Sequence, residues 1–100
     1  MPIKVAINGF GRIGRNILRN CIDDKDIEFV AINDITDEKT LAHLLKFDSV
    51  FGVLPAEVSG SDGCINVSGR CIRVLAERDP SKLPWKELDV DIVLECTGLF

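Results

Sequence analysis

The sequence lacks the features that mark membrane, secreted and nucleic-acid-binding proteins. None of its apolar runs is long enough to span a bilayer. No charged stretch followed by an apolar one precedes the first apolar run, so we expect no secretion signal. Lysine and arginine total 12 against 16 aspartates and glutamates, a net charge of −4, and no basic block occurs. Because nucleic-acid binding depends on clustered cations, the sequence argues against a nucleic-acid partner as well as against a membrane.

The cysteines are not arranged for metal or redox chemistry. The four cysteines, Cys21, Cys64, Cys71 and Cys96, include no Cys-x-x-Cys pair. The sequence therefore gives no indication of a zinc site or a redox motif. Each cysteine lies among apolar neighbours, and we expect all four to be small, reduced residues of the core. Reduced thiols in a chain without a leader favour a cytoplasmic location.

The overall composition is that of an ordinary globular domain. Hydrophobic residues make up 46% and charged residues 28% of the chain, which argues against a disordered polypeptide. A length of 100 residues suffices for one small domain. No internal repeat or low-complexity tract divides it.

A glycine pattern near the start of the chain is the strongest functional signal. The apolar run over residues 3–8 leads into Gly9-x-Gly11-x-x-Gly14, and a helical pattern follows. In that order the pattern is the fingerprint of dinucleotide binding. Gly9 allows a tight turn, Gly11 lets a pyrophosphate approach the backbone, and Gly14 lets the helix pack closely on the strand. The helix N-terminus then attracts the phosphates. The alternative is a simple strand-to-helix turn.

An acidic residue follows the second apolar run at the position that this interpretation requires. Residues 27–33 end in Asn33, and Asp34 comes next. It lies roughly 20 residues past the last glycine, where an acidic residue hydrogen-bonds the adenosine ribose. Asp34 would repel the 2′-phosphate of NADP, and residues 32–37 contain no arginine to neutralise it, so NAD is expected. The alternative is that Asp34 is only a helix N-cap or turn residue.

Periodicity extends this pattern along the first half of the chain. We expect a buried strand over residues 3–8, a helix over about residues 12–21 and a second strand over residues 27–33. A second helix follows, with Thr36 or Asp37 as its N-cap. The residues expected on the buried faces of these two helices are Ile13, Ile17, Leu18 and Cys21 in the first and Leu41, Leu44 and Leu45 in the second.

Between Phe51 and Ala76 polar and apolar residues alternate, and glycines such as Gly60 interrupt the pattern. This favours short antiparallel strands, the last two joined by a tight turn at Ser68-Gly69. These strands are expected at about residues 56–59, 64–67 and 70–76. A loop, a short helical turn and another buried strand are expected over residues 79–80, 83–88 and 91–95.

The order of these elements predicts an α/β fold. It corresponds to the first half of a Rossmann-type doubly wound parallel sheet with a short antiparallel insertion. The last strand should be followed by another helix, so we expect residues 1–100 to form an incomplete dinucleotide-binding domain.

Five segments, taken in order, point to one family. They are residues 7–15 (INGFGRIGR), 33–34 (ND), 44–49 (LLKFDS), 77–80 (ERDP) and 95–98 (ECTG). Together they resemble the glyceraldehyde-3-phosphate dehydrogenases, and the resemblance covers all 100 residues. Phe47 stands where Tyr is common, and Phe51 where a polar residue is frequent, so the branch of the family is open. The alternatives are an erythrose-4-phosphate dehydrogenase, which shares the N-terminal pattern, and a non-catalytic dinucleotide-binding module.

The resemblance implies an NAD-dependent enzyme of which this chain is the NAD-binding part, with the catalytic domain outside it. Such an enzyme is a cytoplasmic homotetramer of glycolysis. It oxidises glyceraldehyde 3-phosphate, with NAD and inorganic phosphate, to 1,3-bisphosphoglycerate.

The resemblance also assigns roles to residues of this sequence. Arg12 and Ile13 would offer backbone N–H groups to the pyrophosphate. Asp34 would hold the adenine ribose, and the backbone carbonyl of Arg78 would contact the adenine. The cofactor-binding residues expected from the fingerprint and the family together are Asn8, Gly9, Phe10, Gly11, Arg12, Ile13, Gly14, Asn33, Asp34, Arg78, Thr97, Gly98 and Phe100.

No catalytic residue is expected within this chain. The family uses a cysteine nucleophile, assisted by a histidine base, in a Ser-x-Cys-Thr-Thr-Asn motif that has no match here. Cys96 follows a strand beside the expected cofactor groove, but its setting favours a buried structural residue. His43 is the only histidine and lies on the second helix without a thiol or acidic partner nearby in sequence. We therefore expect the 100 residues alone to be inactive and only marginally stable.

Overall fold

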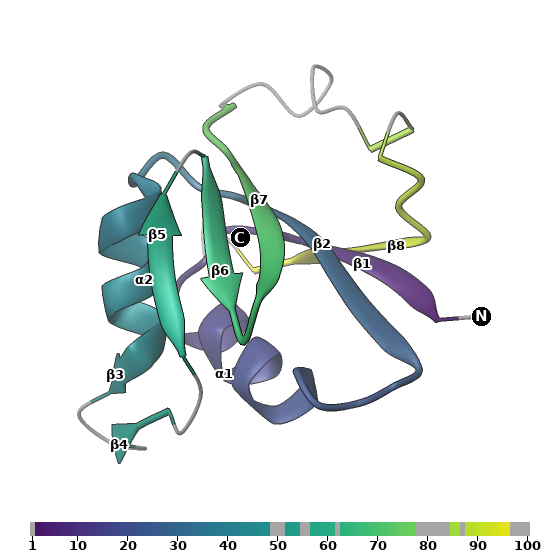
Figure 1. Cartoon of the computed structure of the whole chain (residues 1–100). Coiled ribbons are helices and arrows are strands. Elements are labelled where there is room, and N and C mark those ends of the chain that lie inside the picture. Colours follow the sequence, from purple (N-terminus) through teal and green to yellow (C-terminus); the bar gives the residue numbers. More distant parts are fainter. Residues whose placement is uncertain are drawn as a thin grey trace.

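Four parallel strands form the centre of the fold. The computed structural model describes residues 2–48, 52–54, 57–61, 63–77, 85–86 and 88–96. Within them, β1 (Ile3–Asn8), β2 (Ile27–Asn33), β7 (Arg70–Leu75) and β8 (Ile92–Glu95) lie side by side in the order β7-β2-β1-β8. The sheet grows from β1 through β2 to β7 on one side and then continues with β8 on the other (Figure 1). This reversal beside β1 confirms the Rossmann-type α/β fold.

Two antiparallel strands extend the sheet beyond β7. They are β5 (Val58–Ser61) and β6 (Cys64–Val67), so the sheet runs β5-β6-β7-β2-β1-β8. The expected turn between β6 and β7 is confirmed. Ser68 and Gly69 both have positive φ, 50° and 85°, as a two-residue hairpin turn requires. The β5 prediction was wrong by two residues, because the strand continues through Gly60 to Ser61.

A small ribbon was not predicted from the sequence. It pairs β3 (Phe47–Asp48) with β4 (Gly52–Val53) in antiparallel fashion after the second helix. Strands of two residues are too short to show an alternating pattern. The helical turn expected over residues 83–88 and the loop at residues 79–80 fall largely outside the described residues.

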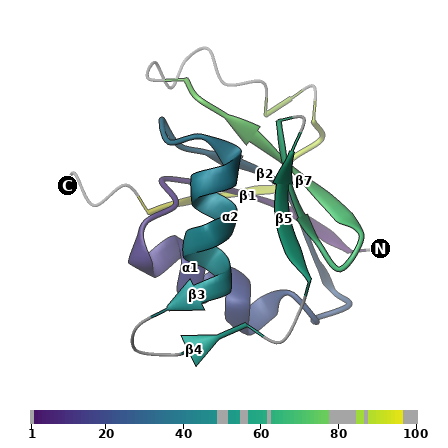
Figure 2. The ribbon, with the colours of Figure 1, turned by 60° about the vertical axis from the view of Figure 1, so that its left-hand side comes forward.

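Two helices cover one face of the sheet, α1 (Arg12–Cys21) and α2 (Glu38–Lys46), as Figure 2 shows. Each follows one of the two central strands, as parallel crossovers require. The side chains that fill the space between helices and sheet include Ile7, Leu18, Ile32, Leu41, Leu45, Ile65 and Ile72, all fully buried. Across the part of the chain that is described, no helix is long and apolar enough to cross a membrane.

The buried faces of the helices differ from the expected ones at two positions. Ile13 is 64% exposed and Leu44 is 36% exposed, so both predictions were wrong. The face of α1 against the sheet runs through Gly14 and Leu18, and the C-cap residue Ile22 continues it at the same spacing of four residues. The other predicted residues of this helix are confirmed, since Leu18 is fully buried and Ile17 and Cys21 pack against the core. Ile13 was chosen in place of Gly14 because Gly14 carries no apolar side chain.

Asp37 is the N-cap of α2, which settles the choice between Thr36 and Asp37. Its carboxylate accepts a hydrogen bond from the backbone N–H of Thr40 at 2.8 Å. That hydrogen bond stabilises the charged form and lowers the pKa of Asp37. The capped helix start fixes where α2 follows β2 and therefore fixes the chain around Asp34.

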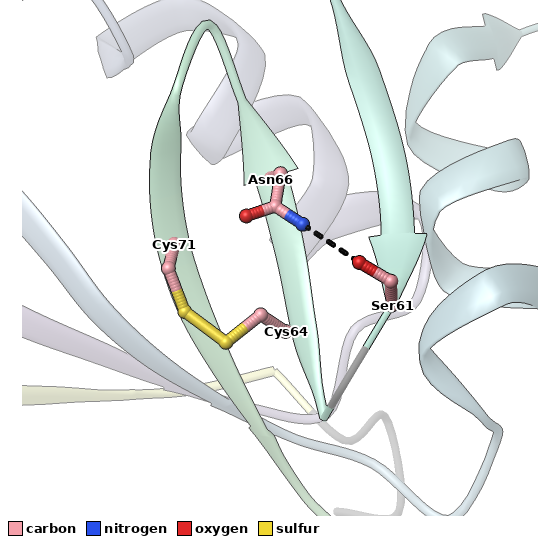
Figure 3. Close-up of a disulfide and its surroundings, with 4 residues drawn as sticks. All are labelled: Ser61, Cys64, Asn66 and Cys71. Carbon is pink, nitrogen blue, oxygen red and sulfur yellow. Dashed lines mark hydrogen bonds between the residues drawn. A yellow bond between two sulfur atoms is a disulfide. The ribbon is translucent and has the colours of Figure 1, made fainter.

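The cysteine prediction was wrong for two of the four residues. Cys64 and Cys71 form a disulfide across the β6–β7 hairpin, with their Cα atoms 5.5 Å apart (Figure 3). Ile65 and Ile72 pair on the buried face, so the neighbouring cysteines project from the opposite face. On that side of β6, Asn66 donates a hydrogen bond to the Ser61 hydroxyl at 3.3 Å (Figure 3). Cys21 and Cys96 are free thiols and half-buried.

Arg19 links the two helices and supports our first prediction. Its guanidinium donates to the carbonyls of Leu45 and Lys46 at 3.0 and 2.9 Å and of Gly52 at 2.8 Å. The last carbonyls of a helix have no partner within it, and a cation there also complements the helix dipole. We expect Arg19→Met, which keeps the apolar stem, to lower the free energy of unfolding by about 2 kcal/mol.

Chemical denaturation of the purified protein measures this effect. Lys25→Met is the matched control, because Lys25 is exposed in the turn before β2 and the same charge is removed. Its expected change is below about 0.5 kcal/mol. Equal losses in the two variants would contradict a specific role for Arg19.

Candidate functional site

The carboxyl ends of the parallel strands meet at one edge of the sheet. Asn8 ends β1, Asn33 ends β2, and Glu95 ends β8. The strand register places Asn8 opposite both Asn33 and Glu95. This edge includes the point beside β1 where the strand order reverses. Ligands of open α/β sheets bind at that point.

The glycine turn between β1 and α1 has the conformation that the fingerprint requires. Gly9 has a φ of +92°, which side-chain-bearing residues rarely adopt, and its N–H donates to the carbonyl of Asn33 at 2.8 Å. A Cβ on Gly14 would lie 2.8 Å from the carbonyl oxygen of Gly9 and 3.0 Å from Ile7 Cγ2. The close packing expected of Gly14 is therefore present.

Gly11 leaves one side of the turn open. A Cβ built on it would meet no atom within 4 Å. Gly11 is also the N-cap of α1, makes no side-chain capping hydrogen bond, and no acidic residue lies in the first helical turn. A helix does not satisfy its own first N–H groups, and its dipole makes that end positive. The turn therefore offers an anion a direct approach to the backbone.

Asp34 lies over this turn although it is 24 residues from Phe10. One carboxylate oxygen accepts from the backbone N–H of Phe10 at 2.9 Å, and the other accepts from the N–H of Thr36 at 3.0 Å. The Asp34 N–H donates to the carbonyl of Leu75 at 2.8 Å. A carboxylate has about four acceptor positions, so each oxygen keeps capacity for a further donor. Asp34 is thus a turn residue and also a positioned acceptor beside the glycine turn.

Four other residues of the glycine segment contribute in different ways. Phe10 is only 1% exposed, so its side chain belongs to the core and only its backbone faces the turn. Arg15 donates to the carbonyl of Phe10 at 3.1 Å and fixes that peptide. Ile13 and Arg12 are exposed at the start of α1. An exposed apolar residue at the mouth of a site supplies contact area for a ligand.

Asn8 and Asn33 face protein groups. Among the residues that the structure describes, these two are the buried polar ones. The Asn33 amide donates to Asn8 and to the carbonyl of Glu77, while the Asn8 amide donates to the Glu95 carboxylate. Four of the expected cofactor-binding residues, Arg78, Thr97, Gly98 and Phe100, lie outside the described residues.

The candidates for catalysis are poorly placed for it. Burial, together with the negative charge of Glu95, raises the pKa of the Cys96 thiol, which disfavours the thiolate that acts as a nucleophile. His43 is exposed on α2 and its ring contacts that of Phe47, with centroids 4.9 Å apart. Within the described ranges, no group of three or more His, Cys, Asp or Glu residues could hold a metal ion.

A glycine turn at the switch point, an open helix N-terminus and a carboxylate held above them define a Rossmann-type dinucleotide-binding domain. The family model described as "Glyceraldehyde 3-phosphate dehydrogenase, NAD binding domain" matches residues 3–100. The chain therefore belongs to the glyceraldehyde-3-phosphate dehydrogenase family, and its cofactor is NAD.

Curated relatives agree with this assignment. The chain is 59% identical over 100 residues to a glyceraldehyde-3-phosphate dehydrogenase of Geobacillus stearothermophilus, covering 100% of this chain and 30% of the relative. It is 59% identical over 99 residues to the glyceraldehyde-3-phosphate dehydrogenase of Thermotoga maritima, covering 97% of this chain and 30% of the relative. It is 57% identical over 97 residues to glyceraldehyde-3-phosphate dehydrogenase 1 of Bacillus cereus, covering 97% of this chain and 29% of the relative. The chain thus spans about three tenths of the length of these relatives.

Proposed function

We propose that this chain is the NAD-binding part of an enzyme that oxidises glyceraldehyde 3-phosphate to 1,3-bisphosphoglycerate with NAD and inorganic phosphate. The observation that carries the proposal is the Asp34 carboxylate held against the open glycine turn. The names of the relatives support this substrate over erythrose 4-phosphate and over a non-catalytic module. The proposal includes a homotetrameric assembly and a cytoplasmic, glycolytic role.

Different residues at the carboxyl ends of the strands bind different parts of the cofactor. The backbone N–H groups of Arg12 and Ile13 bind the pyrophosphate at the positive end of α1. Asp34 accepts hydrogen bonds from the hydroxyls of the adenosine ribose. The backbone carbonyl of Arg78 contacts the adenine. Thr97, Gly98 and Phe100 line the groove beyond the fingerprint.

Bound NAD supplies a hydride acceptor for the oxidation of the aldehyde. The cysteine nucleophile and the histidine base belong to a catalytic domain outside residues 1–100. The raised pKa of Cys96 supports this division, because that thiol is poorly suited to attack a carbonyl. We therefore expect residues 1–100 alone to be inactive. In the whole protein, NAD reduction should require both glyceraldehyde 3-phosphate and phosphate, with erythrose 4-phosphate the weaker substrate.

Our second prediction concerns cofactor choice. Asp34→Gly removes the ribose acceptor and the charge that repels a 2′-phosphate, so NAD binding should weaken and NADP binding should strengthen. We expect the ratio of NADP affinity to NAD affinity to rise at least about tenfold. Titration calorimetry with both dinucleotides measures the ratio. Asp23→Gly removes the same charge from an exposed turn and should leave the ratio unchanged. Unchanged NADP affinity in Asp34→Gly would contradict the role of this carboxylate.

A further inference from the structure

A continuous row of hydrogen bonds joins the ends of the four parallel strands. The Asn33 side chain accepts from the N–H of Glu77 at 2.9 Å and donates to the carbonyl of Glu77 at 2.9 Å. Its second N–H donates to Asn8 Oδ1 at 2.8 Å. Asn8 Nδ2 then donates to Glu95 Oε2 at 2.8 Å. The row runs from the segment after β7, through β2 and β1, to β8.

The direction of these hydrogen bonds is fixed by the protein backbone. The N–H and carbonyl of Glu77 allow only one orientation of the Asn33 amide. Asn33 Nδ2 then directs its other hydrogen at Asn8, which must present its oxygen there and its nitrogen to Glu95. Both hydrogens of the Asn33 amide are used, so this amide has no hydrogen left to donate to a ligand.

The row borders the groups that hold the adenosine end of the cofactor. Asn33 directly precedes Asp34, and the Asn33 carbonyl accepts from the N–H of Gly9 at 2.8 Å. The Asp34 N–H donates a hydrogen bond to the carbonyl of Leu75. Leu75 is the last residue of β7 and lies two residues before Glu77. A shift of the chain at Glu77 would therefore move the backbone that supports Asp34.

We propose that Asn8, Asn33 and Glu95 are positioning residues, which fix the Asp34 carboxylate and the chain at Glu77 for the adenosine half of the dinucleotide. The two asparagines, expected from the sequence to touch the cofactor, act through Asp34 and the backbone instead. This inference rests on the proposed function, since it assigns parts of the same site. The two asparagines of the row are buried, and buried polar groups specify one arrangement when every one of them is satisfied.

Reversing the Asn8–Glu95 hydrogen bond tests the proposal. Asn8→Asp keeps the size of the side chain and the oxygen that accepts from Asn33, but it places a second carboxylate against Glu95. We expect ADP and NAD to bind about tenfold more weakly. Glu95→Gln alone keeps an acceptor for Asn8 but removes the charge that strengthens the hydrogen bond, and we expect it to weaken the binding of both ligands by less than about threefold. In the double variant Asn8→Asp/Glu95→Gln, the new amide can donate to the new carboxylate at unchanged net charge, and we expect affinity within about threefold of the original.

The measurements use the whole protein made from its full gene, with titration of ADP and NAD and a parallel unfolding curve for each variant. A folded Asn8→Asp variant with unchanged affinity would overturn the proposal. So would a double variant impaired as strongly as Asn8→Asp, because rescue is the effect that a general loss of packing does not produce. If the unmodified protein binds no NAD, the proposed function fails; if it binds and the variants bind equally, only the positioning role fails.

Asn33→Ser provides a second test in case Asn8→Asp does not fold. Serine is too short to bond both Glu77 and Asn8. Hydrogen exchange at the Glu77 amide should accelerate at least about tenfold, and ADP affinity should fall by a similar factor. Asn20→Ser, at an exposed position of α1, is the matched control and should change neither quantity. Faster exchange at Glu77 with unchanged ADP affinity would also overturn the proposal.

Discussion

Replacing Gly60 with alanine is expected to lower the free energy of unfolding by about 3 kcal/mol or more. A Cβ at this position would lie 2.4 Å from the carbonyl oxygen of Glu38, 2.6 Å from its carbonyl carbon and 2.8 Å from the Cα of Lys39. These are backbone atoms of the first turn of α2, so they cannot rotate away. The clash can be relieved only by moving β5 or α2, and either movement disturbs the core between them.

Thermal or chemical unfolding of Gly60→Ala measures this loss. Ser59→Ala is the matched control, because Ser59 is the neighbouring residue of β5 and its side chain is exposed. We expect the control to change stability by less than about 0.5 kcal/mol. A Gly60→Ala variant as stable as the control would mean that β5 and α2 are not in close contact in solution.

The sequence could not reveal this role of Gly60. A glycine in an alternating segment usually marks a turn or a bulge. The sequence therefore predicts a strand over residues 56–59 that ends before Gly60. The close approach depends on how α2 lies across β5, and the sequence contains no signal for that packing. The same limit explains Ile13 and Leu44, since the orientation of a helix is decided by what it packs against.

The order of the parallel elements was predictable because it depends on local sequence patterns and not on packing between distant elements. Buried parallel strands are continuous apolar runs, and β1 and β2 have the expected bounds. At the candidate site, the turn at the glycines and the position of Asp34 beside it were predictable, because the fingerprint consists of their spacing. The hydrogen bonds among Asn8, Asn33, Glu77 and Glu95 were not predictable. They join strand ends that are far apart in sequence, and only the folded sheet defines the directions of these side chains.

Gly11→Ala is expected to reduce NAD affinity by about a hundredfold with little loss of stability. Gly11 has φ −82° and ψ −160°, an extended conformation that alanine adopts without strain, and its added Cβ would contact no protein atom. The cost to folding is the less favourable helix N-cap, below about 1 kcal/mol. The added methyl group instead occupies the open side of the turn, where a pyrophosphate must approach the backbone.

Gly14→Ala, one helical turn away, is the informative comparison. Its Cβ would lie 2.8 Å from the carbonyl oxygen of Gly9 and 3.0 Å from Ile7 Cγ2, so this variant should lose both stability and NAD binding. Titration of NAD and an unfolding curve, measured on both variants, separate the two roles. A Gly11→Ala variant that binds NAD normally would show that the pyrophosphate does not approach through Gly11. If Gly11→Ala instead loses stability as Gly14→Ala does, the turn is packed against protein in solution and its open side does not exist.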